Sequence, residues 1–194
     1  LEGLPIKIVE EKYECGCWGR LHPPRIDGDT IIVEAGKGYQ SNHHLHFQNF
    51  SIDDVDATSV LITVRKSGDF YGHAIKKYIA GRDDGSLFIT QVPKTVETLS
   101  AAYAYLTPKA AQKPGTIRQG DIFFVPTKRK IAPEKFVDGA IRGNHHGKIA
   151  HIGNQIYATG TFTHPQHAPV TLTGVYRVAF AKNAARHPAR RGGD

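Results

Sequence analysis

The longest strand-like stretch of the chain is Val170-Thr171-Leu172-Thr173-Gly174-Val175-Tyr176-Arg177-Val178-Ala179-Phe180. It is rich in β-branched side chains and partly alternates apolar with polar ones, as strands with one face on a core do. Shorter runs of this kind lie at Thr30–Glu34, Leu45–Phe47, Ser59–Arg65, Leu87–Val92, Asp121–Val125 and Gln155–Thr159, separated by Gly-, Asp- and Pro-containing turns. We therefore predict an α+β, strand-dominated fold, built on an antiparallel or mixed sheet or a small barrel with a few short helices.

Helical signals are fewer. Thr95 or Thr98 can cap a helix over Val96–Leu106, which Pro108 would end. Shorter helices are expected at Gly72–Ala80 and at Pro133–Ile141, where Pro133 suits a first turn.

The domain organisation follows from the breaks between these runs. Thr107–Thr116, broken by Pro108, Pro114 and Gly115, is the best linker candidate. We expect an N-terminal β-rich unit at 1–112, a C-terminal β-rich unit holding two histidine clusters at 117–180, and a basic, disordered tail at 181–194.

Composition excludes some classes of protein. Hydrophobic residues make up 40% of the 194 residues and charged ones 22%, which is ordinary for a globular domain. No run reaches the roughly 18 apolar residues that span a membrane. Cys15 and Cys17, separated only by Gly16, are too close for an unstrained disulfide and are interpreted as reduced thiols of a cytoplasmic protein.

The charge favours a nucleic-acid partner. Net charge is +7 and the pI is about 9.4. Basic residues gather in the tail and between Lys128 and Lys148, a stretch that runs into a histidine cluster. A solvated basic face without a partner is the alternative. If the tail contacts phosphate, deleting it should reduce the salt dependence of binding.

Most of the eleven histidines fall into three groups: His43, His44 and His46, then His145, His146 and His151, then His164 and His167. Imidazole is both the commonest metal ligand and the side chain whose ordinary pKa lies nearest neutrality. The groups therefore indicate either a metal centre or acid–base chemistry.

The second and third groups suit metal-independent RNA cleavage. Two imidazoles can move the protons of the 2′-hydroxyl and of the leaving oxygen, and a lysine can stabilise charge on the phosphate. We assign these catalytic roles to His145, His146, Lys148, His164 and His167, around one pocket. No carboxylate lies within residues 139–167, which argues against an acidic magnesium nuclease.

A metal site is the competing interpretation. His44 and His46 are two apart on an expected strand, so both would project from one face. With His151 they are the candidate ligands of zinc, manganese or iron. Ordinary polar positions near a strand end or in a loop would explain the same residues.

The C-terminal half carries a resemblance. Gln119-Gly120-Asp121 leads a hydrophobic stretch ending at Pro126, and is followed by Asn144-His145-His146, His164-Pro165-Gln166-His167-Ala168-Pro169 and Gly174-Val175-Tyr176-Arg177-Val178. This order resembles an uncharacterised family of small phage and bacterial proteins, over about residues 117–180. The resemblance implies a compact unit of phage or mobile-element ancestry and no particular reaction.

The function predicted from the sequence is a hydrolase or lyase acting on nucleic acid, with RNA favoured and no membrane partner. The alternative is a non-catalytic, histidine-rich metal-binding or interaction module. Phosphate-loop, serine-elbow and H-E-x-x-H motifs are absent from the sequence.

Overall fold

The computed structural model describes residues 4–12, 21–40, 44–68, 73–83 and 85–182. For 37–40, 44–46 and 68 it describes the backbone only. Cys15, Cys17 and nearly all of the tail at 181–194 lie outside the described residues. The described chain divides into two compact units: unit 1 runs to Arg82 and from Leu87 to Tyr103, and unit 2 comprises Asp83–Ser86 and Ala104–Lys182.

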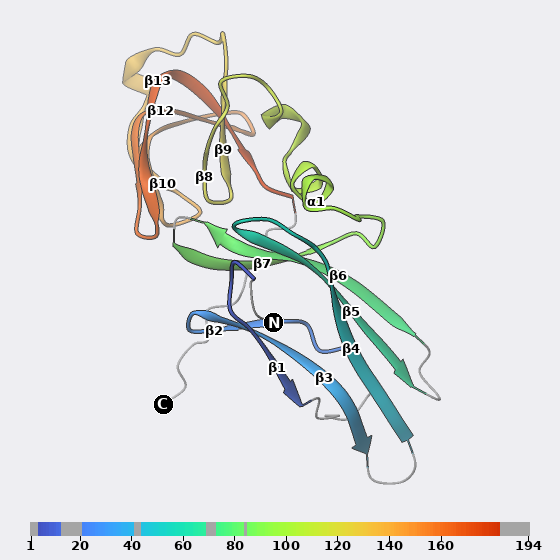
Figure 1. The fold of residues 1–194 in the computed structure, drawn as a ribbon. Coiled ribbons are helices and arrows are strands. Elements are labelled where there is room, and N and C mark those ends of the chain that lie inside the picture. Colours follow the sequence, from blue (N-terminus) through green and yellow to red (C-terminus); the bar gives the residue numbers. More distant parts are fainter. Residues whose placement is uncertain (1–3, 13–20, 41–43, 69–72, 84, 183–194) are drawn as a thin grey trace. The chain divides into compact units, whose positions relative to one another are not determined.

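Unit 1 is built on a seven-stranded mixed sheet that curls into a half-barrel (Figure 1). Its strands are β1 (Ile8–Lys12), β2 (Arg25–Asp27), β3 (Thr30–Gln40), β4 (His44–Val55), β5 (Ser59–Gly68), β6 (Ala74–Asp83) and β7 (Ser86–Val92). The order is β1-β3-β4-β5-β6-β7, with β2 also on β3. Among the described pairings of unit 1, only β1 and β3 run parallel.

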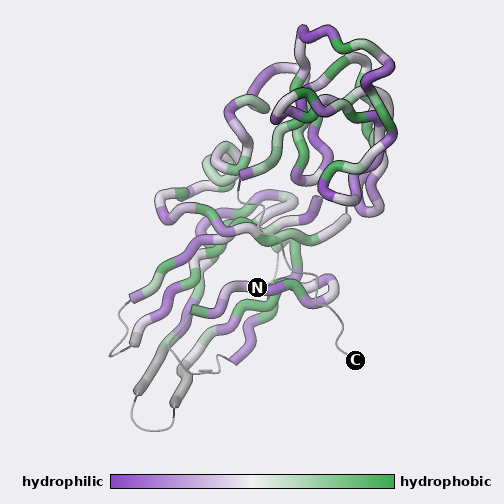
Figure 2. The backbone as a smooth tube through the Cα atoms, turned by 180° about the vertical axis from the view of Figure 1, so that it is seen from behind, coloured by the Kyte–Doolittle hydropathy of each residue, from purple (hydrophilic) through white to green (hydrophobic). Residues whose placement is uncertain are grey.

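The core of unit 1 comes from alternate residues of these strands. Val60, Ile62 and Val64 of β5 and Ile31 and Val33 of β3 enter one buried cluster. Figure 2 shows the corresponding alternation of hydrophobic and hydrophilic positions along the strands. The period of two therefore fixes which face of the sheet is buried.

Unit 2 is a six-stranded antiparallel sheet in the order β10-β11-β12-β13-β9-β8. Its strands are β8 (Ile117–Gln119), β9 (Ile122–Pro126), β10 (Val137–Ile141), β11 (His145–Ile152), β12 (Gln155–His164) and β13 (His167–Phe180). The stretch Val170–Phe180 thus lies in the longest strand, which pairs with both β12 and β9. The strand-dominated fold predicted from the sequence is confirmed.

The two faces of the unit 2 sheet differ. The inner face is defined by the core residues Ile122, Phe124, Ile141, Ile149, Ala158, Phe162, Leu172 and Val178. On the opposite, outer face, Phe123 and Val125 pack with Ala111 of η1 (Lys109–Ala111), a 3₁₀ turn. The segment considered as a linker, Thr107–Thr116, therefore falls within unit 2 and packs on it through Ala111.

One helix prediction is confirmed. The helix α1 (Leu99–Leu106) ends where expected, and Thr98 Oγ1 accepts a hydrogen bond from the Ala101 N–H at 3.1 Å. The Asp54 carboxylate accepts the Leu99 N–H at 2.8 Å. Two of the amide groups that a helix start leaves without partners are satisfied in this way.

Two helix predictions are wrong. The described part of Gly72–Ala80 lies in β6, which pairs with β5 and buries Tyr78 and Ala80 in the core of unit 1. Pro133 starts only a single 3₁₀ turn, η2 (Pro133–Lys135), and Val137–Ile141 forms β10. In both cases strand pairing and burial outweigh local helix propensity.

Candidate functional site

Strand β11 separates His145 from its neighbour His146. Successive side chains of a strand point to opposite faces. His145 lies on the inner face with Ile149 and is only 2% exposed, whereas His146 is exposed on the outer face. The residues predicted to share one pocket therefore divide into an inner group around His145 and an outer group, which consists of His146 and Lys148.

His145, His164 and His167 form the inner group, which we call the imidazole stack. The ring centroids of His145 and His164 are 4.3 Å apart and those of His164 and His167 4.4 Å apart, so His164 is the middle ring. His164 ends β12 and His167 begins β13, and the two are register partners across the turn at Pro165 and Gln166. The backbone of His164 is extended, the conformation that a following proline favours.

Gln119 fixes the orientation of His145. Its Nε2 donates to the carbonyl oxygens of Ala168 at 2.8 Å and Phe162 at 3.3 Å, so its Oε1 must face the other way. That Oε1 lies 3.0 Å from His145 Nδ1. Because the amide oxygen only accepts, His145 Nδ1 carries the hydrogen and Nε2 holds the lone pair in the neutral ring.

Gly120 supports His167. Gly120 has φ +57°, and a Cβ built on it would lie 2.4 Å from His167 Nε2. Any side chain at this position would collide with the imidazole, and the backbone conformation itself favours glycine. The glycine therefore allows the stack to sit directly on the turn between β8 and β9.

Asp121 and Arg142 close the other side of His145. Asp121 Oδ1 lies 3.5 Å from His145 Nε2, and the same carboxylate pairs with Arg142. Burial of the ring, followed by the positive charge of Arg142, lowers the pKa of His145 to about 4. His145 is therefore neutral at pH 7.

His164 is neutral for similar reasons. Burial, and then the charges that His145, His167 and His146 carry when protonated, lower the pKa of His164 to about 4. Its Nδ1 accepts the backbone N–H of Gln166 at 3.0 Å, so the hydrogen of the neutral ring is on Nε2.

The chemistry open to the imidazole stack is limited. A general acid works best with a pKa near the working pH, and a ring with a pKa of about 4 is almost never protonated at pH 7. Within the described part of the chain, no group of three or more His, Cys, Asp or Glu side chains is placed to hold a metal ion. Of the three rings only His145, at 2% exposure, is buried as deeply as the residues of the inner core.

The outer group lies on the β10–β11 pair. Asp138 is the register partner of Lys148, and Ala140 that of His146. These four residues point outward from neighbouring positions, because Gly139 and Gly147 between them belong to the inner face. The two register pairs form the corners of a rectangle. Three corners carry ionisable groups, and the fourth carries only the methyl group of Ala140.

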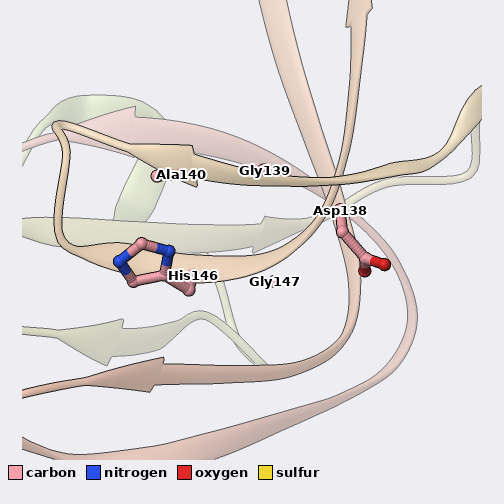
Figure 3. Close-up of a pocket in the computed structure, with 5 residues that line it drawn as sticks. All are labelled: Asp138, Gly139, Ala140, His146 and Gly147. Carbon is pink, nitrogen blue, oxygen red and sulfur yellow. The ribbon is translucent and has the colours of Figure 1, made fainter.

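A hollow of about 520 Å³ opens at this rectangle. It is lined by Asp138, Gly139, Ala140, His146 and Gly147 (Figure 3). Across an antiparallel pair, diagonal neighbours such as Asp138 and His146 are about 7–8 Å apart at their Cα atoms. A small group bound in the hollow can therefore lie within reach of both side chains.

Three predicted metal ligands remain. His151 is exposed near the end of β11, as the register partner of Ile156. His44 and His46 lie in β4, in unit 1, and their side chains are outside the described residues. The metal role predicted for these three histidines stays a prediction.

The sequence reasoning missed Gln119, Asp121, Arg142 and Asp138 as residues around the histidines. Gln119, Asp121 and Asp138 lie outside residues 139–167. The sheet brings them close to the histidines from β8, the β8–β9 turn and β10, respectively. The Gln119-Gly120-Asp121 motif was the available signal, since all three of its residues contact or flank the stack.

Comparisons with known proteins add no family or function, because no family model, curated protein or solved structure matches the chain. None of the described helices is long and apolar enough to cross a membrane.

Proposed function

We propose that unit 2 cleaves RNA by internal transphosphorylation at the outer-face hollow. The observation that carries the proposal is the rectangle of Asp138, Lys148 and His146 around Ala140, which places a carboxylate, an ammonium group and an imidazole on one open face. This revises the predicted constellation: His146 and Lys148 keep catalytic roles, while His145, His164 and His167 become supporting residues.

Each group has one task. The Asp138 carboxylate takes the proton of a ribose 2′-hydroxyl, whose oxygen then attacks the adjacent phosphorus. The P–O5′ bond breaks, and the imidazolium of His146 gives its proton to the leaving 5′-oxygen. Lys148, opposite Asp138 and two residues from His146, stabilises the negative charge on the phosphoryl oxygens. The products are a 2′,3′-cyclic phosphate and a 5′-hydroxyl.

RNA is favoured over DNA because the reaction uses the 2′-hydroxyl as its nucleophile. It also needs no metal ion, in keeping with the few carboxylates on this face. The imidazole stack contributes indirectly: it fixes the first residue of β11, and thereby the register that brings His146 opposite Ala140.

The test uses the purified chain with an oligoribonucleotide and its 2′-O-methyl counterpart, each with and without EDTA. We expect cleavage of the first only, with 2′,3′-cyclic phosphate ends and no effect of EDTA. Intact RNA under all conditions would refute the proposal. Cleavage of the 2′-O-methyl strand, or loss of activity in EDTA, would refute the mechanism.

The same preparation tests the non-catalytic alternative. Stoichiometric zinc, manganese or iron in untagged protein, together with absence of turnover, would favour a metal-binding module. A chain that retains no metal and cleaves RNA would exclude it.

A further inference from the structure

A second feature of the outer face lies beside the hollow. Arg129 Nη1 donates to the hydroxyl of Tyr157 at 3.2 Å, and the Arg129 Cζ lies 5.3 Å from the centre of the Tyr157 ring. Tyr157 is only 5% exposed, whereas Arg129 is exposed. The guanidinium therefore covers the tyrosine and remains accessible from solvent.

The position of Arg129 is fixed by its loop. The Arg129 N–H donates to Thr127 Oγ1 at 3.2 Å, and the Thr127 N–H donates to the Val175 carbonyl of β13 at 3.3 Å. A guanidinium held in one orientation loses little freedom when a ligand binds to it. The loop therefore presents a preorganised, planar cation.

The surroundings of this cation are basic. Lys128 and Lys130, on either side of Arg129 in sequence, are both exposed. Arg177 is the register partner of Tyr157 on β13 and points to the same outer face. The outer face therefore carries several cations around Tyr157.

The tyrosine under this cation lies near Lys148, which follows Gly147 of the hollow's lining. Tyr157 is the register partner of Ala150 and Thr159 that of Lys148. Lys148 and Tyr157 are thus diagonal neighbours on adjacent strands, about 7–8 Å apart at their Cα atoms. Neighbouring nucleotides of one strand can span such a distance.

We infer that the outer face binds single-stranded RNA, with a nucleobase stacked on the Arg129 guanidinium and the chain leading to the hollow. The inference rests on the proposed function and names its substrate class. Guanidinium–base stacking needs an unstacked base, which single strands offer and duplexes do not. Such stacking tolerates any base, so the site discriminates between single strands and duplexes more than between base sequences.

The test measures binding without cleavage. A fluorescent 2′-O-methyl oligouridylate and an abasic oligomer of equal length are titrated into the full chain and followed by anisotropy. Arg129→Lys keeps the charge and removes the stacking plane. We expect this variant to bind the oligouridylate about tenfold or more weakly, while its affinity for the abasic oligomer stays within twofold.

Controls separate stacking from charge and from folding. Lys109→Ala removes an exposed cation of η1 and should weaken both oligomers equally and slightly. The melting temperature of Arg129→Lys should lie within about two degrees of that of the unmodified chain, which corresponds to a loss of stability on the order of a few tenths of a kcal/mol. Such a small difference shows that the variant is folded.

Equal binding of the oligouridylate by Arg129→Lys and the unmodified chain would overturn the inference, and so would equal loss for both oligomers. Either result leaves cleavage at His146 to be judged by its own assay. If binding depends on stacking but the chain does not cleave RNA, the single-strand site is supported and the proposed reaction is refuted.

Discussion

His145 and His146 are adjacent in the chain and lie in two regions that differ in almost every physical respect. His145 is buried, hydrogen bonded to Gln119 and neutral, with its pKa lowered to about 4. His146 is exposed and lines an open hollow beside Asp138. Histidines that are neighbours in sequence therefore need not share one site when they lie on a strand. His145 has the burial and hydrogen bonding of a structural residue, whereas His146 has the exposure that the proposed reaction needs.

The largest effect expected from this division is on activity. His146→Ala should lower the rate of RNA cleavage by about 10²–10⁴-fold, because it removes the proton donor for the leaving oxygen. Its melting temperature should barely change, since the side chain is exposed. His151→Ala is the matched control, as another exposed histidine of β11, and should cleave normally.

The opposite result would contradict this division between His145 and His146. If cleavage survives in His146→Ala but is lost per folded molecule in His164→Ala, the inner stack is the working site and the outer hollow is not.

The next effect is on stability and concerns His145. His145→Ala should lower the free energy of unfolding by about 3–4 kcal/mol, because it leaves a cavity and deprives Gln119 Oε1 of its donor. Urea titration measures the loss. Residual activity, corrected for the folded fraction, should match the unmodified chain, and a folded but inactive protein would contradict the structural role.

Acid should destabilise the inner region. In the unfolded chain a histidine binds its proton below about pH 6.5, whereas His145 and His164 in the folded protein do so only below about pH 4. The unfolded state therefore binds more protons between these values, and stability falls as the pH drops from 6.5 to 4. For the buried His145 alone the effect is on the order of 3 kcal/mol.

Chemical denaturation at pH 7, 5.5 and 4.5 tests this dependence. His145→Gln should show a smaller slope than the unmodified chain, because it removes the buried imidazole. A stability that is independent of pH between 6.5 and 4.5 would show that the stack titrates normally.

Part of this arrangement was predictable from local pattern. The alternation in Ser59–Arg65 and Val170–Phe180 predicted strands, and Thr98 predicted the start of a helix, because these signals depend on neighbours in sequence. The same period of two, counted back from Ile149, places His145 inward and His146 outward. The neighbours His145 and His146 do not form one unit, because successive side chains of a strand face opposite ways.

The rest depends on contacts between distant residues. The bond between Gln119 and the Ala168 carbonyl joins positions 49 apart, and nothing near Gln119 predicts it. The register shift between His146 and Lys148 on β11 likewise follows from how β11 pairs with β12. Val137–Ile141 contains Gly139, which leaves room for the Ile149 side chain, and that pairing makes the segment a strand.

The smallest predicted effect compares two glycines of unit 2. Gly120 and Gly143 both have positive φ, of +57° and +82°, so an alanine at either is strained by about 1–2 kcal/mol. Only at Gly120 would the new Cβ meet a neighbour, the His167 ring, while at Gly143 nothing lies within 4 Å. Gly120→Ala should therefore be less stable than Gly143→Ala by a further 1–2 kcal/mol or so, from overpacking against the stack. Urea titration of both variants measures this difference directly, and the backbone cost largely cancels. Equal losses would mean that His167 moves aside freely, and that the stack is looser than its contacts with Gly120 and His164 indicate.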